Sequence, residues 1–152
     1  MKKLALFLAL NSFILANSLP IGLVCKKVSK DEVQKALNTT FKSIKPTKLP
    51  FEPPYNFSGC EYSNSVLPEV SINYYYKSSA NVYPPDSKVK ELKGLNFPAR
   101  AVFAKNGDIF EIIGDTKEGS KILIVLNSGI KEGSKEYNNT LKLLKKLVKE
   151  FK

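Results

Sequence analysis

Few side chains in this sequence could take part in covalent or acid–base chemistry. The sequence contains no histidine, so it cannot supply a Ser-His or Cys-His nucleophile. Carboxylates at Asp108, Glu111 and Asp115 lie beside a turn and along a strand pattern, where such groups are usually solvated and structural. We therefore predict a protein without catalytic residues, and a carboxylate-dependent hydrolase is the alternative.

The first residues have the pattern of a secretory signal peptide. Two lysines precede an apolar run that ends near Ala16 and is too short for a comfortable membrane-spanning helix. Small residues predict cleavage after Ser18 or after Ala16, so residues 1–18 are the leader and residues 19–152 the mature domain. We expect an exported protein, periplasmic or secreted, without a stable membrane span after cleavage. An uncleaved membrane anchor is the alternative.

Export determines how the only two cysteines, Cys25 and Cys60, are interpreted. In an oxidising compartment an even number of cysteines favours a single disulfide over two free thiols or half of a metal site. A zinc site would need further thiolate or imidazole ligands, which the sequence lacks, so we predict neither a metal nor a cofactor. Closing a loop of this length would stabilise the fold by about 3 to 4 kcal/mol.

The charge balance is strongly basic and consists almost entirely of lysine. The net charge of +10 falls to +8 without the two leader lysines, and Arg100 is the only arginine. Specific recognition of nucleic acid tends to use arginine, so we expect no specific nucleic-acid partner. Peripheral attraction to an anionic lipid or polymer is an alternative function, and its binding would weaken with added salt.

The N-terminal half of the mature chain predicts one helix followed by an irregular connection. Ser29 and Glu32 have the spacing of a capping box, and apolar residues continue at helical spacing, which predicts a helix from about Lys30 to Ile44. Four prolines in residues 45–58 then favour an extended connector. A proline-rich peptide ligand is the alternative for this segment.

The segments CEYSN and EVSINYYYKSS alternate with period two and predict an antiparallel pair of strands. Alternation places Tyr74 and Tyr76 on the apolar face, where burial of their rings is expected. Tyr75 is left on the other face. It is a candidate binding residue, together with Tyr55 and Tyr83 in the neighbouring loops.

The C-terminal half predicts further strands and a final helix. We expect a short helix at Lys88–Leu92, a two-residue type I′ hairpin at Asn106-Gly107, and a central strand in KILIVLN. A terminal amphipathic helix follows, with its apolar stripe at Tyr137, Leu141, Leu144, Val148 and Phe151. Such a stripe favours packing on the protein's own sheet over docking on a membrane.

Together these elements predict an α+β fold, in which an antiparallel sheet of about five strands carries an N-terminal and a C-terminal helix. The sequon at Asn138 has an acidic residue, Glu136, two positions before it. This pattern matches the extended acceptor site of some bacterial oligosaccharyltransferases, so Asn138 is a candidate glycosylation site.

Four segments stand in a characteristic order: CKKVSKDEVQKAL, SGCEY opening the first strand, VKELKGLNFPARAVF and the closing LKLLKKLVKEF. This order of elements resembles the PsbP-like α/β sandwich, and it is closest in layout to small exported bacterial domains of the LpqN type. It implies that Cys25 pairs with Cys60. It also implies a non-enzymatic binding or assembly module of the bacterial cell envelope, whose protein or envelope ligand is unknown.

Overall fold

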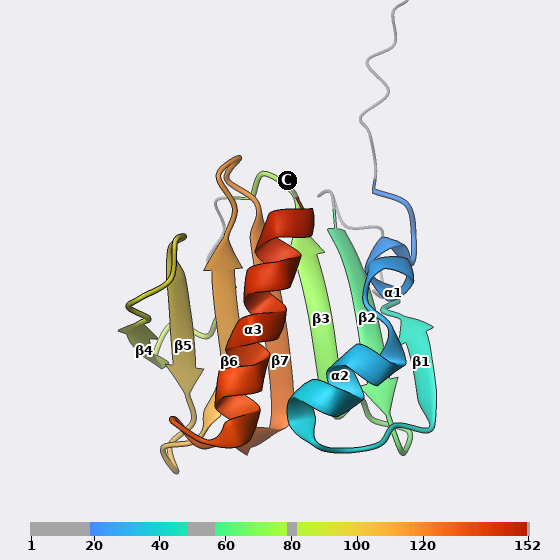
Figure 1. The fold of residues 1–152 in the computed structure, drawn as a ribbon, viewed down its shortest axis with the longest axis horizontal. Helices are drawn as coiled ribbons and strands as arrows, with labels where there is room; N and C mark the ends of the chain where they lie inside the picture. Colours follow the sequence, from blue (N-terminus) through green and yellow to red (C-terminus); the bar gives the residue numbers. More distant parts are fainter. Residues whose placement is uncertain (1–18, 49–56, 79–81, 152) are drawn as a thin grey trace, which may run out of the picture.

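The chain forms one antiparallel β-sheet that carries its described helices on the same face (Figure 1). The computed structural model describes residues 19–48, 57–78 and 82–151. The helices are α1 (Leu23–Lys27), α2 (Lys30–Leu37) and α3 (Lys135–Glu150), and the strands are β1 (Ser43–Pro46), β2 (Phe57–Ser63), β3 (Val70–Tyr75), β4 (Lys88–Glu91), β5 (Ala99–Phe103), β6 (Ile109–Asp115) and β7 (Lys121–Ile130). The predicted α+β class with an antiparallel sheet is confirmed.

The sheet has seven strands within the described residues, in the order β1-β2-β3-β7-β6-β5-β4, rather than about five. Strands β1 to β3 run as consecutive neighbours from one edge, and β4 to β7 run as consecutive neighbours from the other. The two halves join where β3 pairs with β7, with Ile72 opposite Ile124. The predicted number of strands was too low because both edge strands, β1 and β4, were missed.

The central position of β7 follows from its sequence. A strand buried on both faces needs an apolar residue at nearly every position, and Ile122, Leu123 and Ile124 are all almost fully buried. The predicted pairing of β2 with β3 is also confirmed, with Cys60 opposite Ile72.

Helix α2 begins where the capping box predicts. The Ser29 backbone N–H donates to the Glu32 carboxylate at 2.9 Å, and the Glu32 N–H donates to the Ser29 hydroxyl at 3.3 Å. The helix ends at Leu37, because Asn38 takes the left-handed conformation at its C-cap (φ 51°). The predicted continuation to Ile44 is therefore wrong, and Ile44 lies in edge strand β1.

The short helix predicted at Lys88–Leu92 is also wrong. Residues Lys88–Glu91 form edge strand β4, in which Val89 lies opposite Val102 of β5. A four-residue segment with one apolar side chain has too little periodicity to distinguish a helical turn from a strand. Pairing with β5 determines its conformation.

The hairpin between β5 and β6 differs in type from the prediction. The Ala104 N–H donates to the Asp108 carbonyl at 2.8 Å, and the Gly107 N–H donates to the Ala104 carbonyl at 3.0 Å. Residues 105–107 thus form a three-residue loop in which Gly107 has positive φ (87°) and Asn106 does not. A type I′ turn would require positive φ at both Asn106 and Gly107, so that prediction is wrong.

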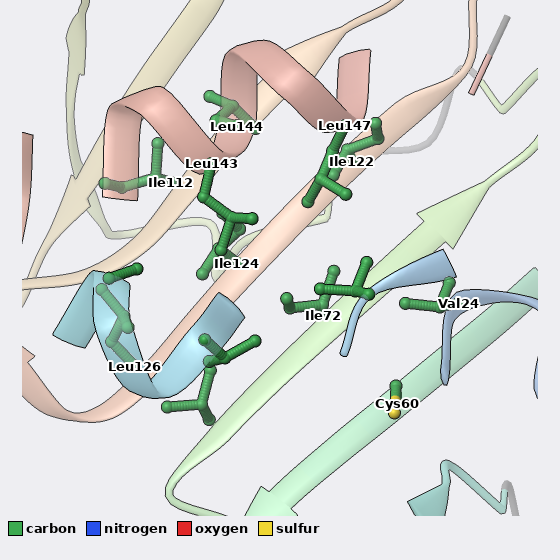
Figure 2. Packing of buried hydrophobic residues seen from close by; sticks show 14 of the residues in the cluster. Val24, Cys60, Ile72, Ile112, Ile122, Ile124, Leu126, Leu143, Leu144 and Leu147 are labelled. Carbon is green, nitrogen blue, oxygen red and sulfur yellow. The ribbon is translucent and has the colours of Figure 1, made fainter. Parts of the chain in front are cut away.

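Helix α3 packs on the sheet and closes the main core (Figures 1 and 2). Leu144 and Leu147 are fully buried against β6 and β7, near Ile112 and Ile122 (Figure 2). Tyr74 reaches the same layer from β3, and its ring centroid is 4.6 Å from that of Phe151 at the C-terminal end of α3. The predicted docking of this helix on its own sheet is confirmed.

Helix α1 is attached to β2 by covalent and polar contacts. The sulfurs of Cys25 and Cys60 are 2.06 Å apart, as in a disulfide. The Val24 N–H donates to the Ser58 hydroxyl at 3.2 Å, and the buried Tyr62 hydroxyl donates to the Val28 carbonyl at 2.9 Å. These contacts hold the start of the described chain against the sheet.

Candidate functional site

Two of the tyrosines predicted as contact residues come together on the face of the sheet opposite the helices, here called the far face. Tyr75 lies there, half-buried, with its ring centroid 5.0 Å from that of Phe57. Tyr83 packs against the same buried residues, whereas Tyr55 lies outside the described residues. Both belong to the far-face cluster, which consists of buried Val102, Ile113 and Leu123 and half-buried Tyr75, Val82, Tyr83, Val89, Phe110 and Val125.

This arrangement gives Tyr75 and Tyr83 a packing role. The segment that leads from β3 towards β4 brings Val82 and Tyr83 against the cluster, so part of the far face is covered by the chain itself. Tyr75 is therefore half-buried and not a freely exposed ring. The predicted division of the three tyrosines between the two faces is confirmed, since Tyr74 is buried in the helix-side core and Tyr76 packs against that core, although Tyr76 is only half-buried.

Glu111 is the most unusual charged residue on the far face. It lies in register with Val102 on one side and Val125 on the other, and only 5% of it is exposed. Its Oε1 atom has no hydrogen-bond partner among the described residues. Burial raises the pKa of Glu111 to about 7. Burial also raises the pKa of Tyr75, and the charge of Glu111 raises it further.

The other two carboxylates do not join Glu111. Asp108 accepts a hydrogen bond from the Asn106 side-chain amide at 3.0 Å within the hairpin, and Asp115 pairs with Arg100 at 2.8 Å and Lys121 at 3.2 Å. Asp115 lies four residues from Glu111 along β6, about 13 Å at 3.3 Å per residue, and Asp108 lies outside the strand, next to the hairpin loop. A lone protonatable carboxyl does not make an acid–base pair, so the carboxylates give no support to hydrolysis.

An open groove lies beside the C-terminal end of α3. Its volume is about 530 Å³, within the range typical of small-molecule sites. Three segments that are distant in sequence form its walls: the β4–β5 connection, the β6–β7 turn and α3. We call it the lysine groove, and it is lined by Asn96, Phe97, Lys117, Glu118, Lys145, Val148 and Lys149.

The floor of the lysine groove is apolar and fixed. Phe97 and Val148 are half-buried and pack against the main core. Helix α3 comes close to β6 at Gly114, where an added Cβ would lie 2.8 Å from Val148 Cγ2 and 3.0 Å from Leu144 Cδ1. Only glycine allows this approach, which brings Val148 to the edge of the groove.

Hydrogen bonds hold the two loops of the groove in place. The Asp115 N–H donates to the Pro98 carbonyl at 2.9 Å, which ties the segment carrying Phe97 to the end of β6. The turn carrying Lys117 is closed by the Thr116 N–H, which donates to the Ser120 carbonyl at 2.8 Å. Ser120 is almost fully buried, so this turn is anchored to the sheet.

The lining of the groove carries mainly positive charge. Lys117, Lys145 and Lys149 are exposed, and no carboxylate of the described residues lies within 4.0 Å of their ammonium groups. Among the described residues, Glu118 is the single acidic one of the lining. Unpaired lysines above an apolar floor can bind an anionic group and shelter an attached apolar group.

Sequence reasoning missed the lysine groove. The signal available was the pair Lys145 and Lys149, one helical turn apart, with Val148 between them on α3. Nothing in the sequence near them indicates that Lys117 and Phe97 lie opposite. Only the packing of α3 across β6 brings these segments together.

The candidate glycosylation site lies at the start of α3. Asn138 is exposed in the first turn, and its side-chain amide donates to the Gly133 carbonyl at 3.4 Å. Its modification stays a prediction.

None of the helices in the described part of the chain is both long and apolar enough to cross a membrane. The chain matches no protein-family model, no curated protein and no solved structure. The resemblance to the PsbP-like sandwich therefore stays a prediction.

Proposed function

We propose that this protein is an exported, non-enzymatic binding module that takes anionic ligands into the lysine groove. Export is supported by the leader pattern in residues 1–18 and by the pairing of Cys25 with Cys60, because disulfides persist in oxidising compartments. A role in the bacterial cell envelope accords with both features.

The observation that carries the proposal is the concentration of unpaired positive charge around one concave site. Three lysines and one glutamate of the described part of the chain line a groove of about 530 Å³. Some lysines of the described chain pair with a carboxylate, as Lys121 does with Asp115 and Lys45 with Glu61. The groove lysines have no such partner among the described residues, so they attract an external anion.

The shape of the site favours a bound ligand over loose surface attraction. A basic protein can accumulate on an anionic lipid or polymer through dispersed lysines, which is the alternative function. Dispersed attraction would depend on the total charge. Binding in the groove would depend on Lys117, Lys145 and Lys149 far more than on equally exposed lysines elsewhere.

A matched pair of triple variants tests this difference. We expect Lys117→Gln/Lys145→Gln/Lys149→Gln to weaken binding of inorganic pyrophosphate or dodecyl phosphate about tenfold, since each lost charge contributes about 0.5 kcal/mol. Titrations followed by amide NMR would place the wild-type perturbations at Asn96 and Lys117. The control, Lys105→Gln/Lys135→Gln/Lys142→Gln, removes the same charge from exposed positions outside the groove.

The control should bind like the wild type. If neither probe perturbs the groove amides, or if both triple variants lose affinity equally, the groove is not an anion site and the proposal is wrong.

A further inference from the structure

We propose that the ligand of the lysine groove is a free, single-chain anionic amphiphile, whose head group binds the lysines and whose alkyl chain lies on Phe97 and Val148. This inference rests on the proposed function, because it assumes that the groove binds anions. It adds the chemical class of the ligand.

The apolar floor is the first argument. An inorganic anion or a charged polymer would gain nothing from the exposed parts of Phe97 and Val148, which remain half-buried in the free protein. An alkyl chain would remove those surfaces from water and contribute affinity in proportion to the area that it covers. The aliphatic stems of Lys145 and Lys149 extend the same apolar surface.

The arrangement of charge is the second argument. Lys145 and Lys149 lie one turn apart on α3, so their side chains leave the same side of the helix. Lys117 belongs to the β6–β7 turn on another wall of the groove. An anionic head group between these walls would meet ammonium groups from two sides, while its chain extends over Val148.

The size of the groove is the third argument. A volume of about 530 Å³ suits one small ligand and is too small for a folded partner or a broad lipid surface. We therefore commit to a monomeric amphiphile in solution, not to a lipid that remains in a bilayer. Carboxylate, phosphate and sulfate heads share the required chemistry.

Chain length separates the contribution of the alkyl chain from that of the head group. Butyl, hexyl, octyl and decyl phosphate would be titrated below the concentrations at which they form micelles. In the wild type we expect the Kd to fall about two- to fourfold for each added methylene that contacts the floor. The slope of log Kd against chain length reports the floor, and the offset reports the head-group site.

Substitutions should change these two quantities separately. Val148→Thr keeps the branched shape but makes the floor polar, so it should flatten the slope. Lys145→Gln should raise every Kd and change the slope much less than Val148→Thr does. Glu118→Gln should tighten binding about two- to threefold, because it removes the one acidic group of the lining. Loss of structure could not produce this opposite sign.

Val66→Thr is the matched control for the floor variant, since Val66 is 89% exposed and lies outside the groove. It should leave the slope unchanged. If Val148→Thr does not fold, Phe97→Leu tests the same surface, because it removes part of the floor while keeping an apolar residue. Circular dichroism would verify that each variant is folded.

Three results would overturn the inference, and they can be told apart. Pyrophosphate binding in the groove with no effect of chain length would leave the proposed function intact and eliminate the amphiphile. Binding to phosphatidylglycerol vesicles but not to any monomeric alkyl phosphate would favour a peripheral membrane protein. Failure of every anion to bind would remove both proposals.

Discussion

Glu111 is the residue whose environment conflicts most with its chemistry. A carboxylate with one buried, unpartnered oxygen is destabilising when it is ionised, because the surrounding apolar cluster cannot replace its hydration. The pKa of about 7 expresses this cost. The Arg100 and Lys121 side chains pair with Asp115 instead.

The Glu111→Gln variant should therefore change how stability depends on pH. The folded-state pKa of about 7 lies above the ordinary value of 4.5, so the folded protein binds more protons between these values. Its contribution to stability falls as the pH rises through that window, by up to about 3 kcal/mol. Glutamine cannot ionise, so the stability of the variant should not show this decline with rising pH. Urea unfolding between about pH 5 and about pH 8 would measure it.

The informative quantity is the stability of the variant minus that of the wild type, since other groups also titrate. This difference should grow with pH. Glu91→Gln, at an exposed position on β4, should show a constant difference. A constant difference for Glu111→Gln as well would show that its carboxyl is hydrated in the folded protein.

At the level of elements, the packing of α3 across β6 is the contact on which the lysine groove depends. Gly114 permits that contact, because a Cβ at this position would lie within 3.0 Å of Val148 Cγ2. Val148 contributes both to this contact and to the floor of the groove. The close packing of α3 on β6 that stabilises the helix therefore also positions one wall of the lysine groove.

We expect Gly114→Ala to lower the free energy of unfolding by about 1 to 3 kcal/mol, because α3 or β6 must shift to accommodate the methyl group. The double variant Gly114→Ala/Val148→Ala should recover part of this loss, since it removes the nearest atom. Denaturant unfolding of both single variants and the double variant would give a coupling energy of about 1 kcal/mol. Strict additivity would show that the methyl group is accommodated elsewhere.

At the scale of the whole molecule, the disulfide connects the start of the described chain to the sheet. It joins α1 to β2 across 35 residues, next to the hydrogen bond from Tyr62 to Val28. The segment it closes includes α2 and the edge strand β1, which has only one neighbour in the sheet. This part of the fold depends on the bond more than the strands around β7 do.

Reduction of the Cys25–Cys60 bond should lower the free energy of unfolding by about 3 to 4 kcal/mol, the loop-entropy value for a closed loop of this size. Guanidinium unfolding with and without a reducing agent would measure the change. The protein isolated without reductant should gain no mass on treatment with an alkylating agent under denaturing conditions. An alkylated product would show that the thiols are free.

Local signals were sufficient for much of the fold. The capping box at Ser29 and Glu32, the alternation through Tyr74 and Tyr75 and the apolar run of β7 each operate over a few residues, so each could be read from the sequence. The stripe of the last helix likewise predicted that α3 packs on the sheet. The excess of lysine indicated the basic net charge, and the two cysteines indicated the disulfide.

Contacts between segments that are distant in sequence determined the rest of the fold and the candidate site. Ile44 and Lys88–Glu91 became strands because β2 and β5 offer partners, whereas their own sequences are ambiguous. Tyr75 is half-buried because it packs against Val102, Ile113 and Leu123 of other strands and lies beside Phe57 of β2. The lysine groove exists only where three segments meet. Periodicity and capping describe the neighbours of a residue along the chain, but a concave site is made by residues that become neighbours only when the sheet and α3 assemble.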